Sequence, residues 1–191
     1  MSDILTIAGS PSNNSRSSAV LELVRNVLEN HGLSTEALSV RDLDATEVFT
    51  ADFNGKTVRD AVAKVHQARA IVIATPIYKA AYSGVLKAFL DLLPQDALTD
   101  KLIFPIATGG SPAHLLAIDY ALKPVLNALG AHHILHGLYI QDSQIQHANG
   151  ELTALDVAIE KRLHTSLMKV VGQLIPAQPE LISFNSIAHV R

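Results

Sequence analysis

The sequence predicts an α/β fold in which helices cover both faces of a doubly wound sheet of five parallel strands. Short segments that are apolar at almost every position alternate with longer segments whose apolar residues recur at steps of three and four. The short segments are typical of strands buried on both faces, and parallel neighbours require crossover helices between them. Hydrophobic residues make up 48% of the 191 positions and charged residues only 17%, so the chain can bury such a sheet.

Five segments are predicted to be strands. The first, ILTIA, ends at Gly9, and the third, AIVIA, is the clearest buried strand, whereas the second is a weaker candidate. Pro105 lies inside the fourth and has no amide hydrogen for a β-ladder, which favours an edge position or a bulge there. In chain order the five segments are 4–8, 35–40, 70–74, 102–108 and 134–140.

Five helices are predicted between and after these strands from apolar residues at helical spacing. The fourth contains Pro124, which removes one backbone hydrogen bond and crowds the carbonyl group of Tyr120, so a kink or a π-type bulge is expected there. The acidic stretch that ends at Asp52 is predicted to be irregular. We expect one domain over 1–175 and a tail over 176–191. The helices cover 20–28, 57–65, 84–93, 113–129 and 155–170.

Composition and charge exclude several classes of function. A formal net charge of −3 gives no field that would attract a nucleic acid. The absence of cysteine removes thiolate nucleophiles and cysteine metal sites. No apolar segment approaches the ~18 residues of a membrane span, and the N-terminus is interpreted as a first strand and not as a signal peptide. We therefore expect a cytoplasmic protein that binds neither membranes nor nucleic acids.

Three loops are expected to lie together at the carboxyl ends of the strands, where doubly wound sheets bind ligands. The first, GSPSNNSRSS, offers hydroxyl groups, one guanidinium group and the free amides of a helix start, all of which suit a phosphate. Simple capping of the following helix would explain the serines equally well. The loop matches neither G-x-G-x-x-G nor the end of a P-loop, which disfavours a Rossmann dehydrogenase and a nucleoside-triphosphate enzyme.

The other two loops suit a flat aromatic ligand. In TPIYKAAYSG, Pro76 would form a rigid wall with Tyr78 and Tyr82. In TGGSPA, the Gly109-Gly110 pair would allow close approach to the backbone. The alternatives are ordinary turns, with the tyrosines packed underneath the second loop. Lys79 would lie within reach of a pyridine-nucleotide phosphate, or would be an ordinary exposed loop lysine.

Together these loops carry a resemblance that none of them carries alone. Through AGSPSNNSRSS, ATPIYKAAYSGVLKAFLDLLP and ATGGSPAHLLAIDYALKPVLNALGA, the chain resembles the NADPH-dependent FMN reductases of the flavodoxin-like superfamily, particularly those of bacterial alkanesulfonate two-component systems. The resemblance implies an oxidoreductase that passes a hydride from NADPH or NADH to FMN. Its reduced flavin would serve a partner FMNH2-dependent monooxygenase in sulfonate sulfur assimilation. Because the hydride passes directly between the cofactors, no catalytic acid or base is expected.

The resemblance also assigns cofactor-binding roles to residues of the three loops. At position 12, the wider family often has arginine where this chain has serine, which favours weak, exchangeable binding of the flavin. The FMN phosphate would be held by Ser10, Ser15, Arg16, Ser17 and Ser18. The isoalloxazine would be lined by Pro76, Ile77 and Tyr78, and its pyrimidine side by Thr108, Gly109 and Gly110.

A homotetramer is also expected. The helices after the third and fourth strands are more apolar than one sheet face needs, and by resemblance Tyr120 would lie in a π-bulge at a tetramer interface. His132, His133 and His136 suggest a metal site, but no carboxylate partner lies near them in the sequence, so no metal is expected.

Two other functions remain open at this point. One is a quinone or azo reductase that holds FMN tightly, and the other is a flavodoxin-like electron carrier without catalysis. The small net charge of −3 disfavours the carrier, because such proteins are usually strongly acidic. The residues do not decide between NADPH and NADH, or between FMN as a bound cofactor and FMN as a released substrate.

Overall fold

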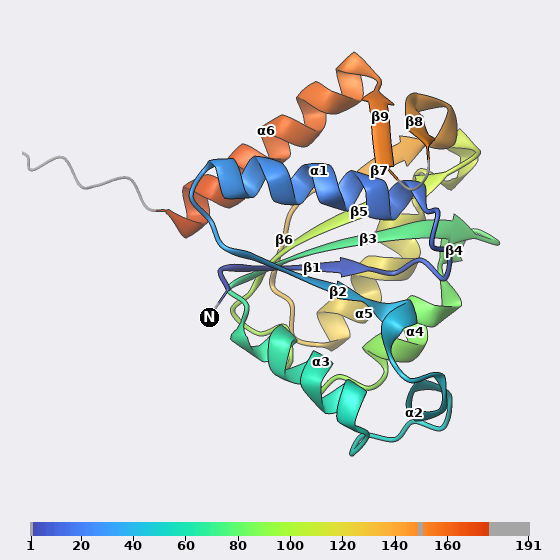
Figure 1. Ribbon diagram of the computed structural model, residues 1–191, viewed down its shortest axis with the longest axis vertical. Helices are drawn as coiled ribbons and strands as arrows, with labels where there is room; N and C mark the ends of the chain where they lie inside the picture. The colour runs from blue at the N-terminus through green and yellow to red at the C-terminus, as the bar shows by residue number, and fades with distance from the viewer. Residues whose placement is uncertain (1, 149–150, 176–191) are drawn as a thin grey trace, which may run out of the picture.

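The computed structural model describes residues 2–148 and 151–175 and has the predicted doubly wound α/β architecture (Figure 1). The parallel strands lie in the order β2-β1-β3-β5, followed by β6 and β7, which together occupy the fifth position. This is the strand order of the flavodoxin-like fold. The strands are β1 Ile4–Ala8, β2 Thr35–Ser39, β3 Ala70–Tyr78, β5 Leu102–Gly109, β6 His133–Ile134 and β7 Leu138–Gln141.

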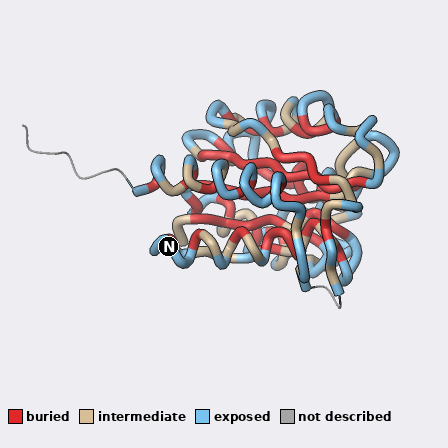
Figure 2. The backbone as a smooth tube through the Cα atoms, turned by 90° about the horizontal axis from the view of Figure 1, so that it is seen from above, coloured by how far each residue is buried: buried red, intermediate tan, exposed pale blue. Residues whose placement is uncertain are grey.

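Two helical layers enclose the sheet, one on each face (Figure 1). Alternate strand residues point to opposite faces, so Ile4 and Phe104 pack under α1 and α6, whereas Leu5 and Ile103 pack against α3, α4 and α5. Figure 2 shows the strands buried in the centre and the outer turns of the helices exposed. The helices are α1 Arg16–Asn30, α2 Ala45–Phe49, α3 Lys56–Gln67, α4 Gly84–Leu90, α5 Lys123–Ala128 and α6 Val157–Leu174.

The predicted fourth helix is not continuous. It consists of a 3₁₀ turn over Pro112–His114, a π-helix over Ile118–Leu122 and then α5. Pro124 is the second residue of α5, where the missing amide hydrogen costs little because the first turn of a helix leaves such groups unpaired. The expected π-type bulge near Tyr120 is therefore confirmed.

The edge position predicted from Pro105 is wrong, because β5 lies inside the sheet. The carbonyl group of Ile103 accepts a hydrogen bond from the Leu135 N–H at 2.8 Å, and residues two apart on a strand face the same neighbour. Pro105 therefore faces the fifth strand, which is interrupted between β6 and β7. Its missing amide hydrogen meets a gap in the ladder, which makes proline tolerable in an interior strand.

One short helix and three short strands were not predicted. The stretch before Asp52 contains α2, capped by the Asp44 carboxylate, which accepts a hydrogen bond from the Glu47 N–H at 3.0 Å. The strand β4 (Ala81–Tyr82) folds back on β3, and β8 (Ile145–Ala148) pairs with β9 (Glu151–Leu155) in a separate antiparallel sheet. The predicted tail, 176–191, lies outside the described residues. Within the described ranges, no helix is both long and apolar enough to cross a membrane.

Candidate functional site

The three predicted loops meet at one edge of the sheet. Ala8 at the end of β1 pairs with Ala74, and Pro76 pairs with Thr108 near the end of β5. The loops that follow these strands are therefore neighbours beyond their carboxyl ends (Figure 1). The structure thus brings the three loops together, and that they bind one ligand stays a prediction.

The first loop is held by its own serines. The Ser15 hydroxyl caps α1 by accepting a hydrogen bond from the Ser18 N–H at 3.4 Å, and it lies 2.9 Å from the buried Ser17 hydroxyl. The Ser10 hydroxyl, also buried, accepts from the Ser12 N–H at 3.2 Å. Ser15 thus caps the helix as expected. The Ser10 hydroxyl only accepts and keeps its own hydrogen for a ligand, and of the Ser15 and Ser17 hydroxyls only one donates in their mutual hydrogen bond.

Arg16 supplies the positive charge of this loop. Its Nη1 lies 3.9 Å from Oδ2 of Asp142, and both side chains are about 40% exposed, at 41% and 39%. Its Nε is buried, and it is the one such side-chain nitrogen or oxygen in residues 2–148 and 151–175 without a hydrogen-bond partner. A buried donor without an acceptor costs about 1–3 kcal/mol. An anionic ligand at the start of α1, such as a phosphate, would supply the acceptor.

A second guanidinium group reaches the same loop and was missed by sequence reasoning. Arg41 follows β2, and its Nη1 donates a hydrogen bond to the Ser12 carbonyl group at 2.7 Å. A hollow of about 300 Å³ lies here, and Asn13 and Ser18 are among the residues that border it with Arg41. The contact falls at position 12, where the resemblance leads one to expect arginine. The sequence carried no direct signal for this contact, because the contact depends on β2 lying beside β1.

The second loop is a tight hairpin between β3 and β4. Tyr78 pairs with Ala81, and the two residues between them, Lys79 and Ala80, have φ values of +50° and +68°. Two successive positive φ values are typical of a type I′ turn, which usually contains asparagine or glycine. Tyr78 is 49% exposed, so the prediction of tyrosines packed beneath the loop is wrong for this residue. Its ring is available beside the half-buried Pro76 and Ile77.

Ser83 ties the second loop to the first. Its hydroxyl donates a hydrogen bond to the Gly9 carbonyl group and accepts one from the Leu86 N–H at 3.2 Å, which caps α4. Its own N–H donates to Oγ1 of Thr75 at 3.1 Å. These contacts fix the relative positions of the two loops before any ligand binds.

The third loop is closely packed on a buried tyrosine. Thr108 is buried, and a Cβ atom at Gly109 would lie 2.6 Å from the Tyr139 hydroxyl oxygen. That hydroxyl donates a hydrogen bond to the Ser111 carbonyl group at 2.6 Å. Burial, with a smaller contribution from the negative charge of Asp142, raises the pKa of Tyr139. Tyr139 therefore stays a neutral donor at neutral pH, and Gly110 beside it is exposed.

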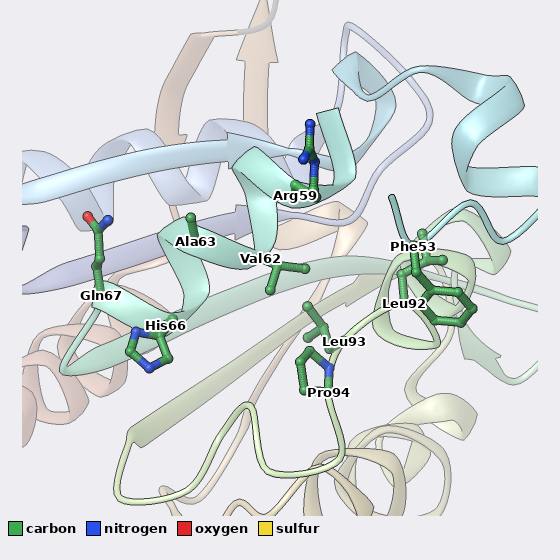
Figure 3. Close-up of a pocket in the computed structure, with 9 residues that line it drawn as sticks. All are labelled: Phe53, Arg59, Val62, Ala63, His66, Gln67, Leu92, Leu93 and Pro94. Atoms are coloured by element: carbon green, nitrogen blue, oxygen red, sulfur yellow. The ribbon is translucent and has the colours of Figure 1, made fainter. Parts of the chain in front are cut away.

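Two other groups of residues lie apart from this site. His132, His133 and His136 are exposed, and no set of three or more metal-ligating side chains occurs in the described part of the chain. A separate cavity of about 530 Å³ lies on the α3 side, where Val62, Leu93 and Pro94 gather (Figure 3). No residue of the three loops lines this cavity. Its lining consists of Phe53, Arg59, Val62, Ala63, His66, Gln67, Leu92, Leu93 and Pro94.

The strand order defines a flavodoxin-like α/β protein whose three loops meet beyond the carboxyl ends of its strands. Comparison with known proteins makes this specific. The sequence profile of the family described as NADPH-dependent FMN reductase matches residues 2–145. The chain therefore belongs to the NADPH-dependent FMN reductase family and is an oxidoreductase.

Individual relatives cover most of the chain. The FMN reductase (NADPH) of Pseudomonas putida strain KT2440 is 47% identical over 165 residues, which span 86% of this chain and 84% of that protein. The FMN reductase (NADPH) of Escherichia coli K12 is 40% identical over 196 residues, spanning 97% and 98%. The apo crystal structure of the NADH:FMN oxidoreductase EMOB superposes with a TM-score of 0.83 at 36% identity, covering 93% of this chain and 92% of that one.

Proposed function

We propose that this reductase uses FMN as an exchangeable substrate and releases the reduced flavin to a separate FMNH2-dependent monooxygenase. Binding of the FMN phosphate is supported by one observation above all: the Nε of Arg16, at the start of α1, is buried and has no hydrogen-bond partner. FMN supplies a hydride acceptor when it is bound, and NADPH or NADH is the donor.

The first loop is proposed to bind the phosphate. Arg16 would donate from Nε, and the hydroxyl hydrogens that the loop leaves free would donate beside it. No acidic residue lies in the first turn of α1, so the positive end of the helix also favours an anion there. The proposed phosphate ligands are Ser10, Ser15, Arg16, Ser17 and Ser18.

The second and third loops are proposed to bind the isoalloxazine. The rigid hairpin presents Pro76, Ile77 and Tyr78 on one side. On the other lie Thr108, Gly109 and Gly110, and the exposed Gly110 leaves the backbone open to a ligand, because the nearest atom to its missing Cβ is 3.7 Å away. The protein's contribution is then to stack, orient and exclude water, and no side chain is required as an acid or base. Lys79, at the exposed turn of the hairpin, would meet a nicotinamide-nucleotide phosphate.

The wider biological setting is part of the same proposal. We infer a cytoplasmic homotetramer that serves a monooxygenase of sulfonate sulfur assimilation, on the strength of the three resembling segments. Leu115, Leu116 and Tyr120 are 52%, 50% and 78% exposed and follow the third loop directly. A group of exposed apolar side chains favours a protein interface, here one beside the flavin site.

Steady-state oxidation of NADPH and NADH with FMN, FAD and riboflavin tests the proposal. We expect oxidation to depend on added flavin and FMN to be preferred over riboflavin. Equal use of riboflavin would remove the role given to Arg16 and the serines. Flavin retained through purification, with quinones reduced faster than free FMN, would instead indicate a quinone reductase.

A further inference from the structure

We propose that Asp142 is a specificity-determining residue that weakens binding of the FMN phosphate by competing for Arg16. This rests on the proposed use of FMN as an exchangeable substrate. None of the sequence motifs includes Asp142, which lies far from Arg16 along the chain. The fold brings the two together because β7 ends at the same edge of the sheet as β1.

The carboxylate of Asp142 lies between two of the site's loops. Asp142 is the first residue of a 3₁₀ turn that follows β7. The side-chain oxygen of Gln144 closes that turn by accepting a hydrogen bond from the Gln141 N–H at 2.9 Å. Oδ2 lies 3.9 Å from Nη1 of Arg16 in the first loop. The same oxygen lies 3.7 Å from where a Cβ atom of Gly110 would be, in the third loop.

The ion pair with Arg16 is incomplete. A separation of 3.9 Å is too long for a hydrogen bond, both side chains are partly exposed, and the neighbouring Nε has no acceptor at all. Asp142 therefore attracts the guanidinium group without satisfying its donors. A phosphate that satisfied those donors would bring a second negative charge close to the Asp142 carboxylate.

The Asp142 carboxylate and the FMN phosphate would therefore compete for the Arg16 guanidinium group. Asp142 lowers the net positive charge that a phosphate meets and repels it when it arrives, whereas an uncharged ligand feels neither effect. Removal of the charge should then tighten FMN and slow its release, because affinity differences among variants of one site lie mostly in the dissociation rate. For a partly exposed charge, the expected gain is about three- to fivefold.

The test compares FMN with riboflavin, which lacks the phosphate, by quenching of flavin fluorescence. For Asp142→Asn we expect the FMN Kd to fall about three- to fivefold, with a slower off-rate, while the riboflavin Kd stays within about twofold of wild type. The difference between variant and wild type should shrink as salt rises, because salt screens exposed charges. Asp142→Glu keeps the charge and should keep the wild-type ratio of the two Kd values.

A matched control is Asp60→Asn, which removes a carboxylate from the surface ion pair with Lys56 on α3 and should leave both Kd values unchanged. Weaker binding of both flavins by a folded Asp142→Asn variant would overturn the inference, since Asp142 would then bind the ribityl chain or the ring. An unchanged FMN Kd would overturn it as well. The proposed function fails separately, if wild-type protein neither binds FMN nor oxidises NADPH when FMN is added.

Discussion

In the third loop, Gly109 has the least space for a side chain. Its hypothetical Cβ would stand 2.6 Å from the Tyr139 hydroxyl oxygen, whereas at Gly110 the nearest atom is 3.7 Å away. The two adjacent glycines therefore have different reasons to be there: the first is required by packing, and the second leaves a surface open.

Gly109→Ala should lower the free energy of unfolding by about 1–3 kcal/mol, the usual cost of forcing a methyl group into a packed site. Thermal or urea unfolding measures this, with Gly110→Ala as the matched control, expected within about 0.5 kcal/mol of wild type. In a Tyr139→Phe background the alanine should cost less, because the closest atom is gone. An equal cost in both backgrounds would show that the clash lies elsewhere.

Arg41 holds the first loop from outside it, by its hydrogen bond to the Ser12 carbonyl group. Arg41→Ala should raise the FMN Kd about fivefold, since loss of one hydrogen bond from a charged donor is worth about 1 kcal/mol at a partly exposed site. Flavin fluorescence measures the Kd. Arg59→Ala removes an arginine from α3 and serves as the control, for which no change is expected. A wild-type Kd for the Arg41 variant would mean that the loop keeps its shape unaided.

At the scale of elements, α2 and α3 are joined by one carboxylate. Oε2 of Glu47 accepts hydrogen bonds from the Thr57 hydroxyl at 2.6 Å and from the N–H groups of Thr57 and Val58 at 2.8 and 3.1 Å. These hydrogen bonds, that of the Thr57 hydroxyl above all, hold the pKa of Glu47 below its ordinary value. The carboxylate thereby caps α3, whose own N-cap residue, Gly55, has no side chain to do so.

Glu47→Gln should lower the melting temperature at pH 7 and have little effect in acid. A lowered folded-state pKa means that the ionised side chain stabilises the fold above the ordinary pKa of about 4.3, and that this stabilisation is lost as the pH falls through the folded-state value. Melting curves of wild type and variant from pH 7 to pH 3 should therefore converge. A difference independent of pH would mean that the charge has no part in the cap.

The elements also show what the sequence could and could not predict. β1, β3 and β5 were recognisable because they are buried on both faces and so are apolar at almost every position, and the π-helix was recognisable from Pro124. The β8–β9 hairpin was missed because its residues are largely exposed and carry no clear period. The gap between β6 and β7 was missed because Pro105 was considered alone, without the neighbour that it faces.

At the scale of the whole molecule, the strand order determines which loops meet. The alternation of strands and helices predicted a doubly wound sheet, and the resemblance implied its flavodoxin-like form. Most of the candidate site was therefore within reach of the sequence. Arg41 and Asp142 were not, since their contacts with Ser12 and Arg16 join distant parts of the chain. Such contacts depend on where β2 and β7 end relative to β1, and no local pattern records that.

The proposed tetramer is tested by a charge at its expected interface. Tyr120→Glu should convert the tetramer to smaller species in sedimentation velocity at micromolar concentration, because a carboxylate would be buried without a partner. Phe49→Glu places the same charge on another exposed aromatic position, 79% exposed on α2, and should leave the assembly intact. Identical sedimentation of the Tyr120 variant and wild type would move the interface away from the π-helix.

The fifth strand at one edge of the sheet is interrupted, and its two segments, β6 and β7, pair separately with β5. β6 pairs with the start of β5, and β7 pairs with the end of β5. Tyr139 lies in β7, and Asp142 follows that strand directly. No ladder hydrogen bond couples them across Pro105, so they should open as independent cooperative units. In native-state hydrogen exchange, the amides of residues 138–141 should gain protection when FMN binds while that of Leu135 does not. Parallel changes in both would show that the strand opens as one.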